Sequence, residues 1–419
     1  MANRLDNILT ALTQKPRAER VTLIAALLVG AMLMADIVFS DGLINWQGLW
    51  IGGDFLAFYT AGTMAWAGEG LAAYDVASFE AALQSQQSFE PYGLTWQYPP
   101  TAYFLVLPFA LLPYKIGFVL WIASGLGALG LALRTLGLKP SFLLLALASP
   151  LVLVSLIQGQ NSLFFGALLM LALGLPDKRP IMAGLAAGLL TLKPHLGILV
   201  PLAFIAGGYW RSFGAAAITT LALAALASLF FGFENWGAFL ESLQRVGENV
   251  AAQGGLYPFA RMISLYSALG HAGVPANIAM IAHLIFVALL VLLTLFLWRQ
   301  KELPLAIKAA ITIPASLLVP PYGYYYEMVA LLLPVMVLMQ YRFDSKARGF
   351  LILAWPLVLY LPAIQPMVPL QIGFALTLGL LWLTVNIARQ YFKSASAKSL
   401  LQSGSQRADP ARGPDGKPA

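Results

Sequence analysis

The chain has 419 residues, of which 59% are hydrophobic and only 10% are charged, with a formal net charge of +7 at pH 7. Because soluble domains carry about 25% charged residues, this composition excludes an ordinary soluble protein and indicates an integral membrane protein. The absence of cysteine excludes a disulfide framework and a cysteine nucleophile, and the three histidines are scattered, so we expect no metal site.

The first 20 residues are basic and precede an apolar run over residues 21–39. This run is longer than the h-region of a signal peptide and lacks a clear small-residue cleavage site, so we interpret it as an uncleaved first membrane span. Residues 1–20 are then a cytoplasmic segment, and residues 21–393 form one transmembrane domain. The remaining basic residues lie in short loops and tails, as membrane topology requires, so the net charge does not indicate a nucleic-acid partner.

A long segment that does not span the membrane, residues 40–99, follows the first span. No Lys or Arg occurs between Arg20 and Lys115, which predicts that this loop lies on the outer side of the membrane. It contains Asp54 beside two glycines, and an acidic residue in such a position is the leading candidate for catalysis. The alternative interpretation is that Asp54 caps a following interfacial helix, and the two roles are compatible.

Two apolar stretches in the middle of the chain are interrupted by polar residues. Residues 141–175 contain Pro150 and the cluster Gln158-Gly159-Gln160-Asn161, and residues 181–209 contain Leu192-Lys193-Pro194-His195. Broken backbone at membrane depth is tolerated only against protein or a wet cavity, so these positions predict re-entrant or broken helices. For residues 158–161, a simple polar loop is an equally supported alternative. Lys193 could hold a lipid phosphate, and its alternative role is that of a snorkelling lysine.

The second half of the chain contains a second predicted outer loop, residues 232–275, with an interfacial helix and a candidate phosphate ligand, Arg261, whose alternative role is that of a surface arginine. Tyr324 and Glu327 lie at the outer end of a later span, where they could bind sugar hydroxyls or act as interface anchors. The polar tail, residues 394–419, is predicted to be disordered. The sequence thus predicts an all-α polytopic membrane protein with about 12 crossings and both termini in the cytoplasm.

Several motifs, in this order, resemble glycosyltransferase family 87: DFLAFYTAG, GLAAYD, YPPTAYFLVLPFALLP, QGQN, AGLAAGLLTLKPHLGILVPLAFIAGGYWR and PPYGYYYEMVALLLP, over about residues 54–333. The family contains polyprenyl-phosphate-sugar-dependent enzymes of the GT-C class, typified by bacterial α-1,2-mannosyltransferases. The resemblance implies a GT-C-like helical bundle in the inner (cytoplasmic) membrane, with its active site facing the periplasm or outside. It also implies a hexosyltransferase whose partners are a polyprenyl-phosphate sugar, a lipid-linked or glycan acceptor and the bilayer.

The resemblance also implies roles for individual residues. Asp54 matches the family's catalytic aspartate and would act as general base in an inverting transfer, while Lys193 and Arg261 would stabilise the leaving phosphate. No cofactor is implied, because a fixed cation can neutralise that charge. Some members carry histidine near the span that starts at residue 328, where this chain has tyrosines and a glutamate, which leaves specificity open. The residues expected to bind sugar or acceptor are Tyr59, Tyr98, Gln160, Asn161, His195, Tyr324 and Glu327.

The competing hypothesis is a membrane transporter or a flippase of lipid-linked sugars. Broken helices and intramembrane charges are also features of transporters. The sequence shows no clear inverted repeat, and long outer loops are unusual in that class. We therefore favour the enzyme.

Overall fold

A computed structural model gives the fold of residues 51–86, 94–138, 140–253, 259–339 and 370–407, together with scattered residues between 24 and 44 and between 357 and 368. Within these residues the regular structure is helical, apart from two isolated β-bridges. This confirms the predicted all-α class. Most residues of the first predicted span, residues 21–39, are described, and they are helical up to residue 38, whereas another predicted span, residues 350–361, lies largely outside the described residues.

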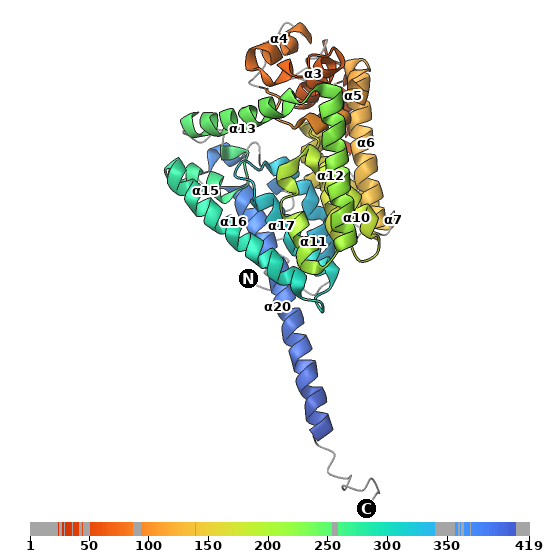
Figure 1. Ribbon diagram of the computed structural model, residues 1–419, viewed down its shortest axis with the longest axis vertical. Coiled ribbons are helices and arrows are strands. Elements are labelled where there is room, and N and C mark those ends of the chain that lie inside the picture. Colours follow the sequence, from red (N-terminus) through yellow and green to blue (C-terminus); the bar gives the residue numbers. More distant parts are fainter. Residues whose placement is uncertain are drawn as a thin grey trace, which may run out of the picture.

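The upper end of the molecule in Figure 1 contains α3 (Phe55–Trp66), α4 (Val76–Gln86) and α5 (Tyr103–Ala110), with η1 (Ala72–Tyr74) and η2 (Pro100–Ala102) between them. The sequence predicts that α3 lies at the membrane interface, but most of its side chains are buried. The ring of Phe55 contacts the rings of Tyr114, Phe118 and Trp121, at centroid distances of 5.3 to 5.5 Å. Helix α3 therefore belongs to the packed core.

Both interrupted stretches are broken where the sequence predicts. The first forms α7 (Pro140–Leu147), α8 (Pro150–Ile157) and α9 (Ser162–Gly174), with breaks before Pro150 and at residues 158–161. The second forms α10 (Pro180–Leu189), η3 (Leu190–Leu192), η4 (Pro194–Leu196) and α11 (Leu199–Gly207), with Lys193 between the two short 3-10 helices. Proline restricts the residue before it and lacks a backbone donor, which explains the breaks at Pro150 and Pro194.

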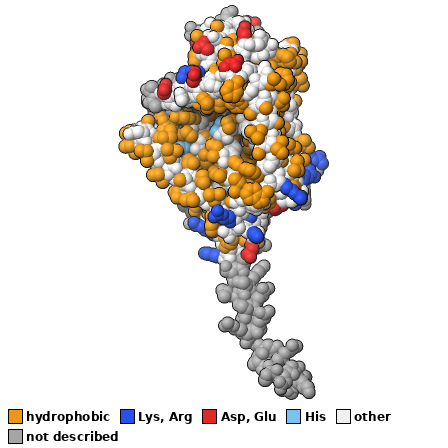
Figure 2. Space-filling view, in the orientation of Figure 1, with side chains coloured by type: hydrophobic (Ala, Val, Ile, Leu, Met, Phe, Trp, Pro, Cys, Tyr) orange, Lys and Arg blue, Asp and Glu red, His pale blue; other side chains and the backbone are white. Residues whose placement is uncertain are grey.

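Among the described residues, four helices are long and apolar enough to cross a membrane: α6 (Tyr114–Thr135), α12 (Trp210–Phe231), α16 (Ala276–Arg299) and the part of α20 over Ile372–Ser394. Figure 2 shows hydrophobic side chains covering the middle of the visible face, as a lipid-facing surface requires. Shorter apolar helices, including α17 (Leu305–Leu318) and α18 (Leu332–Leu338), complete the bundle. The total of about 12 crossings stays a prediction.

The remaining elements are α13 (Glu234–Gln253), α15 (Leu265–His271), η5 (Tyr325–Leu331) and η6 (Gln365–Met367). Helix α13 runs across the bundle near its upper end in Figure 1, whereas α17 is buried along its length and packs against α9, α18 and α20. Helix α20 (Ile372–Arg407) continues beyond Ser394, into the segment for which the sequence predicts disorder. Residues 408–419 of that predicted tail lie outside the described residues.

The two ends of the molecule differ in charge. On the face shown in Figure 2, Asp and Glu side chains gather at the end formed by α3, α4 and α13, whereas most Lys and Arg side chains lie toward the opposite end. Membrane proteins concentrate Lys and Arg in cytoplasmic loops. The distribution therefore agrees with the sides that the sequence assigns to the loops.

Candidate active site

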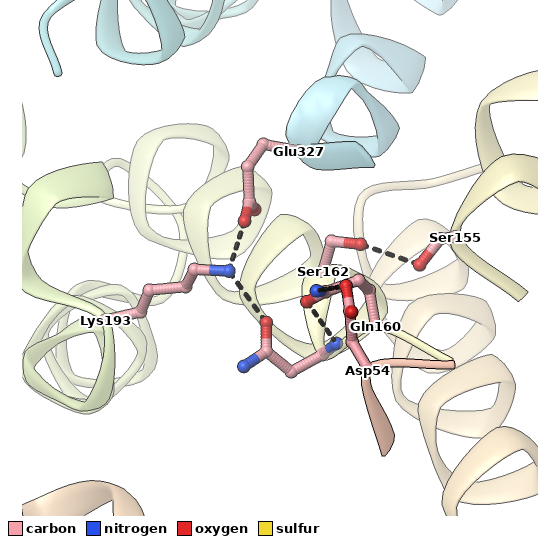
Figure 3. Close-up of polar contacts among 7 residues, drawn as sticks. Asp54, Ser155, Gln160, Ser162, Lys193 and Glu327 are labelled. Carbon is pink, nitrogen blue, oxygen red and sulfur yellow. Dashed lines mark hydrogen bonds and ion pairs between the residues drawn. The ribbon is translucent and has the colours of Figure 1, made fainter. Parts of the chain in front are cut away.

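Asp54 lies immediately before α3, at the end of a turn that contains two glycines with positive φ, Gly52 (74°) and Gly53 (48°). Its backbone N–H donates to the carbonyl oxygen of Gln158, at 3.0 Å. Within the described residues its side chain makes no capping bond to α3, so the interpretation of Asp54 as a side-chain cap is wrong. The carboxylate instead accepts a hydrogen bond from Nε2 of Gln160 (Figure 3).

A close backbone contact brings Asp54 and Gln160 together, although they are 106 residues apart in the sequence. Gly159 has φ of 62°, and a Cβ atom placed on it would lie 1.8 Å from the carbonyl oxygen of Gly52. Glycine is therefore required at position 159, for both its conformation and the space it leaves. Nε1 of Trp121 donates to the carbonyl oxygen of Gly159, at 3.1 Å, and fixes this break against α6.

Lys193 is buried at the second helix break, and the whole residue is only 3% exposed. Its Nζ forms an ion pair with Oε1 of Glu327 and donates to Oδ1 of Asn161, at 2.8 Å. Three rings surround the ammonium, those of Tyr98, Phe165 and Tyr326, with centroids 5.3 to 5.6 Å from Nζ. The snorkelling interpretation is therefore wrong, because Lys193 is paired and enclosed rather than directed to the membrane surface.

Glu327 comes from η5 and is 2% exposed. Figure 3 shows its carboxylate directed toward Lys193, on the side away from Asp54. Its second oxygen, Oε2, is buried and has no hydrogen-bond partner in the part of the chain that the structure describes. Buried polar atoms are nearly always paired, so this oxygen is a candidate acceptor for a hydroxyl group of a bound molecule.

The second outer loop reaches the same region through backbone pairing with the turn before η5. The N–H of Ile263 donates to the carbonyl oxygen of Gly323, at 2.7 Å, and the N–H of Tyr325 donates to that of Arg261, at 3.0 Å. The Arg261 side chain is exposed, and its positive charge acts on Asp54. The ring of Tyr324 stacks on that of Tyr326, with centroids 5.3 Å apart and an interplanar angle of 5°.

Burial raises the pKa of Asp54 above its ordinary value, while the hydrogen bond from Gln160 and the charges of Arg261 and Lys193 partly oppose this shift. A carboxylate with a raised pKa binds a proton more readily than an exposed aspartate does. General bases work best when their pKa approaches the operating pH. The environment of Asp54 is therefore suited to proton abstraction.

Most of the predicted site residues lie in this region, but two do not take part in it. The hydroxyl of Tyr59 donates to the carbonyl oxygen of Leu112, at 2.9 Å, at the far end of α5. His195 is half-buried beside the second break, and none of the contacts above involves it. The sequence reasoning missed Phe165 and Tyr326 as partners of Lys193. Phe165 lies one helical turn after Asn161, on the same face of α9, and this spacing could have identified it.

The described residues contain no group of three or more His, Asp or Glu side chains that could hold a metal ion. Comparison with protein-family models gives a match to the model described as glycosyltransferase family 87, over residues 96–321, which is 226 of the 419 residues. The matched range includes Gln160, Asn161, Lys193 and Arg261, whereas Asp54 precedes it. No curated protein and no solved structure matches the chain.

Proposed function

The chain belongs to glycosyltransferase family 87, and we propose that it transfers a hexose, with mannose as the family's typical sugar, from a polyprenyl-phosphate donor. The acceptor is a hydroxyl group of a lipid-linked or other glycan. The observation that carries this proposal is the environment of the Asp54 carboxylate. It accepts a hydrogen bond from Gln160, the positive charge of Arg261 acts on it, and its pKa is raised. These are the properties of a general base beside an anion-binding group.

A lipid-phosphate donor fits the surroundings of this carboxylate. The donor's leaving group is an anionic phosphate attached to a membrane lipid, so it needs a cation near the membrane surface rather than a nucleotide-binding loop. Arg261 fits this need better than Lys193 does. Its side chain is exposed, and a guanidinium can bind phosphate through two parallel hydrogen bonds. Lys193 is enclosed, and Glu327 already balances its charge.

The proposed reaction inverts the anomeric centre in one displacement. Asp54 takes the proton of the acceptor hydroxyl as its oxygen attacks the anomeric carbon. The bond from that carbon to the phosphate oxygen breaks, and the phosphate leaves with the electron pair. Arg261 stabilises the charge that develops on the leaving group, since fixed charges in a partly dry site act more strongly than in water.

The sugar is proposed to bind on the aromatic side of this site. The stacked rings of Tyr324 and Tyr326 provide a flat surface, Tyr98 lies nearby against Lys193, and Oε2 of Glu327 offers a buried acceptor for a hydroxyl. In this proposal Gln160 and Asn161 hold the site together, while Tyr59 and His195 have no role in binding.

We place this reaction on the outer face of the cytoplasmic membrane. Asp54 belongs to the loop that lacks Lys and Arg, and most basic side chains on the visible face lie toward the other end of the molecule (Figure 2). The sugar must then reach this face already attached to its lipid carrier, so a separate reaction must synthesise the donor.

The experiment uses the purified full-length protein in detergent, with polyprenyl-phosphate mannose as donor and octyl α-mannoside as acceptor. We expect a product one hexose heavier by mass spectrometry, and no product from a nucleotide-activated sugar. A detergent solution has no gradient, so a transporter would give no product. Transfer from the nucleotide sugar alone would contradict the proposed donor class.

A further inference from the structure

Taking the proposed function as its basis, we propose that the Lys193–Glu327 ion pair is a positioning device for the carboxylate of Asp54. The pair holds Asn161, and Asn161 belongs to the same helix break that carries Gln160, the hydrogen-bond donor to Asp54. Lys193, paired with Oε1 of Glu327, would then act on the reaction through other residues, without contact to the donor phosphate, while Oε2 of Glu327 stays available to a sugar hydroxyl.

The first step of the argument concerns Gln160, which is 4% exposed. Its Nε2 donates to Asp54, and its Oε1 accepts from the backbone N–H of Asn161, at 3.4 Å. Its own backbone N–H donates to the carbonyl oxygen of Ser155, at 3.1 Å. The orientation of the Asp54 carboxylate therefore depends on where the backbone at residues 158–161 lies.

The second step concerns Asn161, which occupies the cap position of α9. Asparagine is among the preferred residues there because its side-chain oxygen can accept from the first N–H groups of the helix. In this protein it makes no such bond within the described residues, and the oxygen accepts from Lys193 instead. Instead of capping α9, the Asn161 side chain connects the α8–α9 break to the break at Lys193, 32 residues further along.

The third step concerns why a charged pair is used. A buried ion pair is often no more stabilising than well-packed apolar residues of similar volume, whereas removing one partner leaves a costly unpaired charge. Lys193 and Glu327 lie 134 residues apart, Lys193 at the break between η3 and η4 and Glu327 in the 3-10 helix η5. Their pairing is directional, so it fixes these two segments relative to Asn161 in a way that apolar packing does not.

Three variants distinguish a positioning role of the ion pair from phosphate binding and from a contribution to stability alone. They are the double variant Lys193→Met/Glu327→Gln, whose glutamine keeps an oxygen for the proposed sugar hydroxyl, the variant Asn161→Ala, which keeps the ion pair but removes its link, and the control Lys308→Met. Lys308 is a second buried lysine, 4% exposed, located in α17 outside the site. Transfer from polyprenyl-phosphate mannose to octyl α-mannoside is measured for each full-length protein in detergent, with thermal unfolding beside it.

A displacement of about 1 Å at a reacting group costs on the order of 100-fold, so we expect kcat to fall about 10- to 100-fold in the double variant and in Asn161→Ala. The KM for the donor should stay within about threefold of the wild-type value, and Lys308→Met should keep the wild-type kcat. Wild-type kcat in either test variant overturns the proposal. A donor KM that rises more than kcat falls also overturns it, because Lys193 is then a phosphate ligand. If the double variant does not fold, Asn161→Ala alone decides.

Asp54→Asn, measured in parallel, separates this inference from the proposed function. If Asp54→Asn transfers sugar normally, the proposed function fails and the positioning role fails with it. If Asp54→Asn is inactive while the test variants are fully active, only the positioning role fails.

Discussion

Replacing Gly159 with alanine should separate the two loops that form the site. The new Cβ would lie 1.8 Å from the carbonyl oxygen of Gly52, and real Cβ atoms essentially never come within 3.0 Å of such an atom. The loops must therefore move apart by at least 1.2 Å, the difference between these two distances. No side-chain rotation can relieve the contact, because the opposing atom belongs to the backbone.

The displacement reaches the proposed base directly. Gly52 is two residues before Asp54, and Gly159 is next to Gln160, so the movement acts on both ends of the hydrogen bond between them. A misplacement of this size costs on the order of 100-fold in rate. The positive φ of Gly159 adds a cost of about 1–2 kcal/mol in stability, which lowers the unfolding temperature of the variant.

Gly68→Ala provides the matched control. Gly68 lies in the same outer loop and has φ of 80°, but a Cβ atom on it would meet nothing within 4 Å. The variant Gly68→Ala should therefore have a lower unfolding temperature but the wild-type kcat. Both variants are measured by sugar transfer in detergent and by thermal unfolding. If Gly159→Ala keeps a kcat within about twofold of Gly68→Ala, the contact does not hold the carboxylate, and the reasoning is refuted.

Three further predictions follow from the same region. Because burial raises the pKa of Asp54 in the free protein and the base must be ionised, kcat/KM should fall as pH falls, through a one-proton limb with its midpoint above 3.8; a limb at or below 3.8 would contradict this. Arg261→Gln should lower kcat/KM for the donor about 10-fold, and a wild-type kcat/KM would remove Arg261 from the phosphate site. In this cysteine-free chain, an impermeant thiol reagent applied to intact cells should label Gln97→Cys but not Lys301→Cys, both of which are exposed; the reverse pattern would invert the orientation.

The sequence predicts the features of this fold that depend on local chemistry. Polar residues and glycine at 158–161, and proline after Lys193, interrupt apolar runs, and the helices break at both places. The start of α4, just after Asp75, also depends on local chemistry. Oδ1 of Asp75 accepts from the N–H of Ser78, at 2.9 Å, which satisfies a free donor of the first turn.

The features that depend on long-range packing could not be predicted in the same way. Lys193 needs a buried partner, but nothing in its neighbourhood in the sequence points to Glu327, 134 residues away. Asp54 has the sequence context of a helix cap, and only its contact with Gln160 shows how its side chain is used. The aromatic residues of α3 suit an interface as well as a core, and the rings of α6 decide in favour of the core.

The most direct test of the account is the transfer rate of Asp54→Asn, with Asp75→Asn as control. Asparagine keeps the shape of the side chain and can still accept from Gln160, but it cannot take a proton from the acceptor at neutral pH. Asp75 is an exposed aspartate in the same outer loop and lies outside the site. We predict that Asp54→Asn loses about 100- to 10,000-fold in kcat with donor KM and unfolding temperature near wild type, while Asp75→Asn keeps its rate. Wild-type turnover by Asp54→Asn would contradict the assignment of Asp54 as the base.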